Sequence, residues 1–469
     1  MARPFPNHPQ LRGNYAPIQF EASAPDLVVE GEIPAGISGT LYRNGPNPRF
    51  SPRDDYHWFA GDGMLHAFHI ANGRIDYANR WVRTPKFELE TAAGEALFGV
   101  FGNPMTSDPS TSGKDSGVAN THVIWHGGKL LALEEGHAPF EVDPQTLAAR
   151  GYESYGGGLA GAMTAHPKID PATGQMHGFG YMAGGIGSSD MAYHVIGSDG
   201  SLIRSERFAA PYPAMVHDFA LTEDYAVFPI FPLTFDLERA MSGGPPFAFE
   251  PEKGTRIGIL KRGAPIDELR WVEGPVQFVF HYLNAWNTDE TLFVDCVKFD
   301  AAPNFPAADG TPPPFEAAQG KLARWTIDLK TGRFEEKELC GLSSEFPRID
   351  DRFAARMHRH GYLATASDRQ RGDGGIFNEI SHVDLGDGSI ETWRAGPNDG
   401  VSEPVLVPKS DQAGESEAWV LATVFRAEER RSDLVILDAQ SVAAGPVATA
   451  RLDHRVPYGF HGIWRPNGA

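Results

Sequence analysis

Cysteine and positive charge are both scarce in this chain. Only Cys296 and Cys340 occur in 469 residues, which is too few for a disulfide scaffold, and their spacing does not match a cysteine-based metal site. Lysine and arginine total 41 against 61 aspartates and glutamates, which gives a formal net charge of −20. This charge disfavours binding to nucleic acid or anionic lipid through a broad basic surface. We therefore expect a small neutral or apolar substrate and no nucleic-acid partner.

Long hydrophobic runs and two common catalytic motifs are also missing. The N-terminal sequence "MARPFPNHPQ" lacks the apolar core of a secretory signal, and no uninterrupted apolar run is long enough to cross a bilayer. We expect a cytoplasmic location. Neither the G-x-S-x-G elbow of α/β-hydrolases nor a phosphate-binding P-loop occurs, so nothing supports a hydrolase or a nucleotide-binding protein.

What the sequence does contain is short β-rich runs along its whole length, with many turns among its 52 glycines and 37 prolines. Six stretches run from a strand through a polar turn and out again, as β-hairpins do: "IANGRIDYA", "VDPQTLAARGY", "IDPATGQMHGF", "IGSDGSLIRS", "IDLKTGRFEE" and "VDLGDGSIETW". Hairpins without a linker or a break in composition favour an all-β propeller over two sandwiches. We expect one domain over residues 1–469.

Residues 231–254, "FPLTFDLERAMSGGPPFAFEPEKG", interrupt this pattern. Their apolar, proline-rich character is compatible with a lid, a substrate entrance or a patch that touches a membrane surface. A packed loop is the simpler interpretation.

Histidine is more frequent, at 17 residues. The pairs His66/His69 and His358/His360 have spacings that can ligate a metal, but no third ligand is evident nearby, and we interpret them as structural. Four other histidines lie in or beside β-rich runs, and blades of a propeller can bring such positions to the central axis: His166 in "MTAHPKID", His217 in "AMVHDFAL", His281 in "FVFHYLNAW" and His461 in "YGFHGIW". Considered alone, each of these four histidines is also consistent with a hydrogen-bonded residue of the core.

Three glutamates lie in apolar or proline-bounded settings where an unpaired buried charge would be costly: Glu135 in "LALEEGHAP", Glu345 in "SSEFPRID" and Glu403 in "VSEPVLVP". A metal-bound imidazole commonly donates its second N–H to a carboxylate. Three of the four histidines can therefore be held by these acids, although surface glutamates at turns remain the alternative.

The chain resembles the carotenoid cleavage oxygenases, a family that also includes bacterial enzymes cleaving stilbenes and phenylpropenes. The resemblance runs over nearly the whole chain through an ordered set of motifs: "GEIPAGISGTLYRNGPNP", "HWFAGDGMLHAF", "ANTHVIWHGGKLLALEEG", "AHPKIDPATG", "MVHDFALTEDYAVFP", "EFPRIDDRF", "SEPVLVP" and "RVPYGFHG". It implies a seven-bladed β-propeller with loops and short helices forming a cap over an axial non-haem iron(II) ion, Fe(2+).

Carried onto matching motifs, the resemblance implies that four histidines bind the iron and that three acids hold them: His166, His217, His281 and His461, with Glu135, Glu345 and Glu403. Thr121 in "ANTHV" matches a residue near the open coordination position. Four neutral imidazoles leave up to two of six octahedral positions open. The reaction implied is addition of O₂ across a carbon–carbon double bond, with scission to two carbonyl products.

The choice of alkene depends on three positions expected to line the substrate pocket. Family members that cleave hydroxylated stilbenes or phenylpropenes tend to carry a tyrosine and a lysine for the phenolic oxygen, whereas this chain has Phe101 and Glu134 at the matching motifs. "RVPYGFHG" also resembles the carotenoid-cleaving branch more closely. A polyene tunnel lined by Phe59 and Phe101 is therefore the first hypothesis, and cleavage of a stilbene or phenylpropene is the second.

Two further alternatives stay open at this stage. A propeller that has lost its metal would act as a binding module. A retinoid-type isomerohydrolase on the same site would belong to a branch that this chain does not resemble closely.

Overall fold

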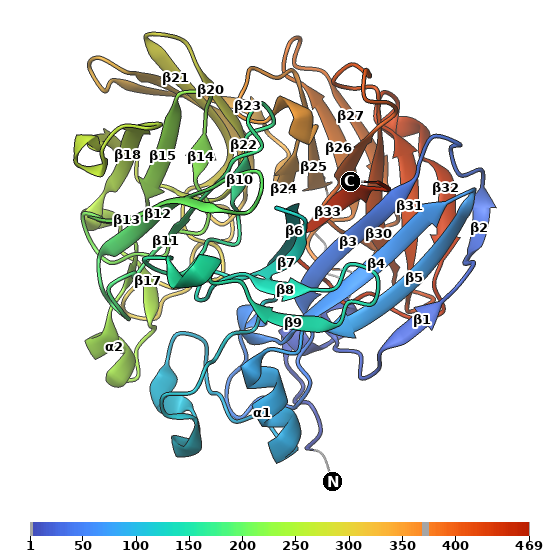
Figure 1. The fold of residues 1–469 in the computed structure, drawn as a ribbon, viewed down its shortest axis with the longest axis horizontal. Helices are drawn as coiled ribbons and strands as arrows, with labels where there is room; N and C mark the ends of the chain where they lie inside the picture. Colours follow the sequence, from blue (N-terminus) through green and yellow to red (C-terminus); the bar gives the residue numbers. More distant parts are fainter. Residues whose placement is uncertain (1–2, 368–374, 469) are drawn as a thin grey trace.

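The computed structural model describes residues 3–367 and 375–468 and is built almost entirely of antiparallel sheets. Within these residues, seven sheets of four or more strands stand around a central axis as the blades of a β-propeller (Figure 1). The predicted fold class is confirmed.

In sheet order, the first blade contains β33 (Gly462–Pro466), β3 (Gly39–Pro46), β4 (Gly63–Ala71), β5 (Arg74–Trp81) and β1 (Ala22–Ala24); the second contains β6 (His122–His126), β7 (Lys129–Leu133), β8 (Phe140–Val142) and β9 (Ala149–Tyr152); and the third contains β10 (Lys168–Ile169), β11 (Met176–Gly180), β12 (Asp190–Ile196) and β13 (Leu202–Ala209). The fourth blade contains β14 (Ala220–Leu221), β15 (Tyr225–Ile230), β18 (Thr255–Lys261) and β19 (Arg270–Gly274); the fifth contains β20 (Phe278–Asn287), β21 (Thr291–Phe299), β22 (Lys321–Asp328) and β23 (Phe334–Cys340); and the sixth contains β24 (Ser343–Arg348), β25 (His360–Ala366), β26 (Glu379–Asp384) and β27 (Ile390–Arg394). In the seventh blade, β28 (Gly400–Val401) and β29 (Val405–Pro408) both pair with β30 (Ala418–Arg426), and β31 (Arg431–Asp438), β32 (Pro446–Arg451) and β2 (Val28–Gly31) follow outward.

Two short helices and a small hairpin complete the described elements that matter for the site. Helix α1 (Pro85–Ala93) starts at Thr84, whose hydroxyl accepts a hydrogen bond from the Phe87 N–H, and helix α2 (Leu237–Met241) starts at Asp236 in the same way. Such side-chain caps satisfy N–H groups that a first helical turn leaves unpaired. Strands β16 (Leu233–Phe235) and β17 (Phe247–Phe249) flank α2 and pair with each other.

Burial along the strands follows from their place in a blade. Strand β20, "FVFHYLNAWN", is buried over nearly its full length, as expected for a strand covered on both faces. Strand β5, which lies next to the edge strand β1, alternates between buried and more exposed positions with the period of two that a half-buried strand requires. The turn before β5 uses Asn72 and Gly73 at positive φ of 52° and 72°, the geometry that a two-residue hairpin loop needs.

All six hairpins predicted from the sequence are present, within the pairs β4/β5, β8/β9, β10/β11, β12/β13, β22/β23 and β26/β27. The two ends of the chain close the ring from opposite sides. Strand β33 near the C-terminus pairs with β3, and β2 near the N-terminus pairs with β32. Figure 1 shows the blue N-terminal strands beside the red C-terminal strands at this closure.

Close backbone contact at the closure depends on glycine. A Cβ added at Gly45 in β3 would lie 2.5 Å from the Cα of Gly459, and one added at Gly459 would lie 2.8 Å from the Asn44 carbonyl oxygen. Because the opposing atoms belong to the backbone, no side-chain rotation relieves either contact. This packing fixes the segment that leads into His461.

We predict that Gly45→Ala lowers the free energy of unfolding by about 1–3 kcal/mol, the usual cost of overpacking. Gly36→Ala is the matched control, since its Cβ would meet only an ordinary contact at 3.6 Å. Thermal and denaturant unfolding of both variants measures the difference. Equal stability of the two variants would contradict the tight closure.

Candidate metal centre and its cavity

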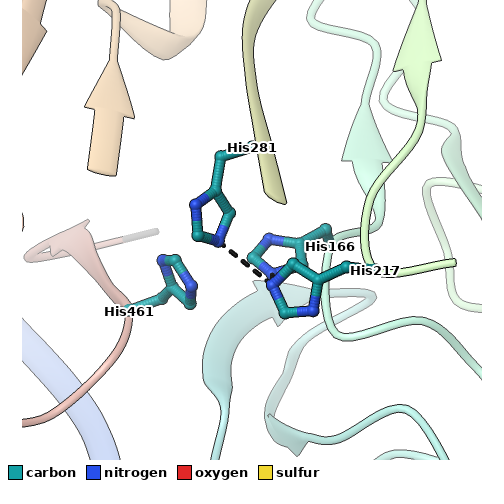
Figure 2. Close-up of side chains that lie close together, drawn as sticks. All are labelled: His166, His217, His281 and His461. Atoms are coloured by element: carbon teal, nitrogen blue, oxygen red, sulfur yellow. Dashed lines mark hydrogen bonds between the residues drawn. The ribbon is translucent and has the colours of Figure 1, made fainter. Parts of the chain in front are cut away.

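Four histidines from four blades point toward one place on the axis (Figure 2). His281 lies within β20, and the other three lie just before the first strand of their blade in sheet order: His166 before β10, His217 before β14 and His461 before β33. The structure therefore brings together all four histidines that the sequence singled out.

The facing ring nitrogens are close and buried. One nitrogen from each ring lies within 4.8 Å of the others, with 3.0 Å between Nε2 of His166 and His217 and 3.1 Å between Nε2 of His217 and His281. All four residues are at least 91 % shielded from solvent, since none exceeds 9 % exposure. Among the described residues, this is the group of three or more potential ligands with a metal-binding geometry.

His281 reaches the axis through an irregular strand. The pairing of β20 with β21 shifts register between Val279 and Tyr282, so Phe280 and His281 lie in a bulge. A bulge bends the strand and re-aims its side chains. The sequence gives no signal for this irregularity, because "FVFHYLNAW" is uniformly apolar and aromatic around the histidine.

Carboxylates hold three of the four imidazoles from behind. The Nδ1 of His217 contacts Oε1 of Glu135. The Nδ1 of His281 lies 2.5 Å from Oε2 of Glu345.

The Nδ1 of His461 lies 2.9 Å from Oε1 of Glu403. A neutral imidazole that donates through Nδ1 keeps the lone pair of Nε2 free to face the axis. His166 has no carboxylate partner among the described residues.

The protonation of the rings follows from burial. Burial and the neighbouring imidazoles hold the pKa of His166 and His461 well below its usual value, and burial lowers the pKa of His281 to about 3. For His217, burial lowers the pKa, but the Glu135 carboxylate outweighs it and the net pKa is raised. Burial raises the pKa of Glu345 to about 8.

Several supporting residues were not found from the sequence. The Tyr181 hydroxyl donates to Oε2 of Glu135 at 2.7 Å, and Arg348 lies 3.2 Å from Oε2 of Glu403. The ring of Phe346 stacks on His281 at 5.7 Å between centroids, with its backbone at a positive φ of 52°. That conformation is costly for an aromatic residue and tends to occur at functional sites.

Two residues of the motif "ANTHV" lie beside the centre. The backbone carbonyl of Thr121 accepts a hydrogen bond from the His461 N–H at 3.2 Å, while its hydroxyl donates to Asn120 at 3.0 Å. Thr121 also lines the cavity, but its place beside an open coordination position stays a prediction. His122 was overlooked: its ring centroid lies 5.2 Å from that of His461, and its Nδ1 contacts the Ala165 carbonyl at 2.8 Å.

A cavity of about 1780 Å³ opens onto the histidine cluster. Phe59 and Phe101 line it, and their rings meet edge to face at 5.7 Å between centroids; their role in binding substrate stays a prediction. Phe280 extends this aromatic wall toward His217, with 5.1 Å between the ring centroids. An apolar lining with a few polar groups is typical of sites for small organic ligands.

Glu134, the third predicted pocket residue, also lines the cavity. Its Oε1 accepts a hydrogen bond from the Val118 N–H at 3.1 Å and lies 2.7 Å from Nδ1 of His137. Burial lowers the pKa of His137, but the carboxylates of Glu134 and Asp115 outweigh it and raise that pKa to about 8.

The two histidine pairs that we interpreted as structural are hydrogen-bonded in the blades. His66 pairs with the Tyr77 hydroxyl at 2.8 Å and His69 with that of Thr40 at 3.0 Å. His358 lies 3.2 Å from the Asn284 side chain, and His360 lies 2.9 Å from His382.

Residues 231–254 form β16, α2 and β17. Phe235 and Phe247 from the hairpin line the cavity, whereas Met241 of α2 is 63 % exposed. A role of this segment as lid, entrance or membrane contact stays a prediction. No helix in the described part of the chain combines the length and the hydrophobicity needed to span a membrane.

Comparison with known proteins identifies a matching family and similar proteins over nearly the whole chain. The profile of the family described as retinal pigment epithelial membrane protein matches residues 15–466. An isoeugenol monooxygenase of Pseudomonas putida is 40% identical over 470 residues, 98% of each chain, and carotenoid cleavage oxygenase 1 of Neurospora crassa is 33% identical over 475 residues, 96% of this chain and 89% of that one. The crystal structure of a lignostilbene dioxygenase of Pseudomonas brassicacearum superposes with a TM-score of 0.95 at 39% identity, covering 99% of this chain and 100% of that one.

A seven-bladed propeller with four axial histidines beneath an apolar cavity defines a metal-dependent oxygenase. This chain belongs to the retinal pigment epithelial membrane protein and carotenoid cleavage oxygenase family. It is an enzyme whose general reaction is oxidative cleavage of a carbon–carbon double bond.

We predict that His281→Ala reduces bound metal to less than about one tenth of the wild-type content and activity by on the order of 100-fold or more, because even supporting residues of metal sites matter at the 10–100-fold level. Metal analysis of purified protein and product formation measure both effects. His69→Ala, at an exposed histidine in β4, is the control and should keep its metal. A fully loaded, active His281→Ala protein would refute the assignment.

We predict a second effect at His137. Its folded pKa, about 8, lies above the ordinary 6.5, so the protonated ring stabilises the fold fully below about pH 6.5, and this contribution disappears as the pH rises through about 8. His137→Gln should therefore cost about 1–2 kcal/mol at pH 6 and little at pH 9. Thermal unfolding at both pH values measures this. His126→Gln is the control, because burial lowers the pKa of His126 and its loss should not cost more stability at pH 6 than at pH 9. A loss of stability in His137→Gln that is the same at both pH values would contradict the ion pairs of His137 with Glu134 and Asp115.

Proposed function

We propose that this chain is an iron(II)-dependent dioxygenase that cleaves the alkene of a phenylpropene or stilbene with O₂. The double bond breaks and each of its carbons receives one oxygen atom, so two carbonyl products account for both atoms of O₂. The observation that carries the proposal is the set of four axial imidazoles beneath an aromatic-walled cavity.

The donor set fits a metal cation. Because His217 and His281 direct Nδ1 to carboxylates, their Nε2 lone pairs face each other at 3.1 Å. Two ring nitrogens this close need a cation between them, which is a proton in a hydrogen bond or a bound metal ion. The carboxylates of Glu135 and Glu403, which face His217 and His461, add negative charge that a divalent ion would offset.

Within this site, His166, His217, His281 and His461 are the proposed ligands. Bound iron(II) would supply the redox-active centre at which O₂ reacts with the alkene. An all-imidazole set is compatible with several first-row metals, and iron is supported by the family resemblance rather than by the ligand geometry.

The chain's own side chains bind and orient the alkene. Phe59, Phe101 and Phe280 offer flat apolar surfaces that exclude water and hold an aromatic ring. Thr121 fixes the backbone of His461 through its carbonyl, and Tyr181 fixes the second oxygen of Glu135.

The comparisons favour an aromatic alkene over a polyene, which reverses the order of the two substrate hypotheses. The isoeugenol monooxygenase is 40% identical and the lignostilbene dioxygenase structure 39% identical, whereas the Neurospora carotenoid cleavage oxygenase is 33% identical. Phe101 and Glu134 were the basis of the polyene hypothesis. We now interpret them as residues that hold the aromatic ring of the substrate in a different way from the tyrosine and lysine of other family members.

We predict that the iron-loaded protein cleaves isoeugenol and (E)-4-hydroxystilbene at least about tenfold faster than an apocarotenal. Reaction under ¹⁸O₂ with rapid reductive trapping, followed by mass spectrometry, should show one label in each carbonyl product. A label in only one product would contradict the dioxygenase stoichiometry.

Cleavage of the apocarotenal alone would restore the polyene hypothesis. Protein that holds no metal after anaerobic reconstitution would support the metal-free binding module instead.

A further inference from the structure

One buried acid beside the histidine cluster has no role in the proposed chemistry. Asp218 directly follows His217 in the sequence, and its side chain is only 1 % exposed. A carboxylate in such a place is costly unless it is paired and hydrogen-bonded. Its partners therefore show which parts of the fold this acid holds together.

Both oxygens of the Asp218 carboxylate are used. Oδ1 lies 2.7 Å from Nζ of Lys168 and accepts a hydrogen bond from the Phe219 N–H at 2.7 Å. Oδ2 accepts a hydrogen bond from the Tyr282 N–H at 3.1 Å. The bond from Phe219 is local and fixes the orientation of the carboxylate. The other two contacts reach neighbouring blades, because Lys168 begins β10 in the third blade and Tyr282 lies in β20 of the fifth.

Each of these two partners lies close in sequence to a proposed metal ligand. Tyr282 follows His281, and one planar peptide group contains both the Cα of His281 and the Tyr282 N–H. The hydrogen bond to Asp218 therefore fixes the peptide plane next to His281, in the bulge where β20 shifts register. Lys168 lies two residues after His166, so its contact acts on that ligand through a longer stretch of chain.

Asp218 differs in this respect from the three glutamates behind the imidazoles. Each glutamate contacts one ring and determines how that ring is turned. The described contacts of Asp218 go to backbone N–H groups and to a lysine, so it determines where the ligand segments lie. The three ligands concerned come from neighbouring blades and face one another on the axis (Figure 2): His166, His217 and His281.

We propose that Asp218 is a positioning residue of the metal centre, which ties three neighbouring blades together so that His166, His217 and His281 meet at one metal ion. This inference rests on the proposed function, since it takes these histidines as metal ligands. Outer contacts of a metal site typically change metal affinity by about 10–100-fold, because they hold the ligands in place. Loss of the acid should therefore weaken metal binding although every ligand is still present.

Binding of cobalt(II) to metal-free protein under nitrogen tests this independently of turnover. Cobalt(II) is a first-row divalent ion like iron(II), and its visible absorption reports the number and arrangement of its ligands. Asp218→Asn keeps the size of the side chain but has one acceptor oxygen, so it cannot accept bonds from both Lys168 and Tyr282. This variant should raise the cobalt Kd about 10–100-fold and change the absorption of the cobalt-saturated protein.

Asp295→Asn is the matched control for a general loss of stability. Asp295 is a fully buried acid in β21 of the fifth blade, and its two oxygens accept hydrogen bonds from Arg324 at 2.7 and 2.8 Å. Its replacement should lower the thermal stability of the protein, because it breaks a buried ion pair. It should leave the cobalt Kd within about threefold of wild type, as expected for sites without shared partners, and leave the absorption unchanged.

Two variants test the link from its other end. Lys168→Met should raise the cobalt Kd by about 3–10-fold, less than Asp218→Asn, because a partly exposed ion pair is screened by solvent and the backbone bonds of Asp218 remain. Lys168→Arg keeps a cation beside the acid and should recover most of the wild-type affinity. This pair of variants decides the matter if Asp218→Asn does not fold.

Three results would each overturn the inference: wild-type cobalt affinity and absorption in Asp218→Asn, an equal loss of affinity in Asp295→Asn, or wild-type affinity in Lys168→Met. The proposed function would survive any of them if the iron-loaded wild-type protein cleaves the aromatic alkenes. The expected changes in Kd without products from any alkene would support the inference and refute the proposed function. Wild-type protein that binds no cobalt would overturn both.

Discussion

The hydrogen bonds from imidazole Nδ1 to carboxylates behind the rings are the constraint on which the site depends. Without them, His217, His281 and His461 would be free to rotate, and the tautomer of each ring would be unspecified. Glu135, Glu345 and Glu403 come from blades other than those of the histidines they hold. Each contact therefore fixes a ring and also ties two blades together near the axis.

The propeller fold brings the backbone of four blades close enough for their histidines to meet on the axis. First strands of separate blades converge at one axis, so a ligand from each needs only to lie at or near the start of its strand. His461 adds a condition, because it lies just before the strand that closes the ring through β3. The close glycine contacts at Gly45 and Gly459 place that segment, which explains why so apolar a stretch stands near the end of the chain.

Much of this was predictable from local sequence. Polar turns between apolar runs identified the six hairpins, because Asn-Gly and related turns have specific backbone requirements. The number of blades was not predictable from spacing, since strands such as β10 and β14 have two residues and the β16/β17 hairpin is inserted between partners of one blade. The blade number and the ligand set came instead from the family resemblance.

Several contacts around the site could not be predicted from local sequence. Glu134 was singled out, but its contact with His137, which also faces Asp115, depends on the missing side chain at Gly117. Tyr181 and Arg348 reach the acids from distant positions. The dense polar run "EEGH" directly after the apolar strand β7 was the one available signal.

X-ray absorption at the iron K edge of protein reconstituted with iron(II) tests the central claim most directly. The account predicts one bound iron per chain whose inner shell is dominated by nitrogen, with the outer-shell scattering of four imidazoles. An inner shell dominated by carboxylate oxygen or sulfur, or imidazole scattering that survives replacement of the four histidines, would contradict it.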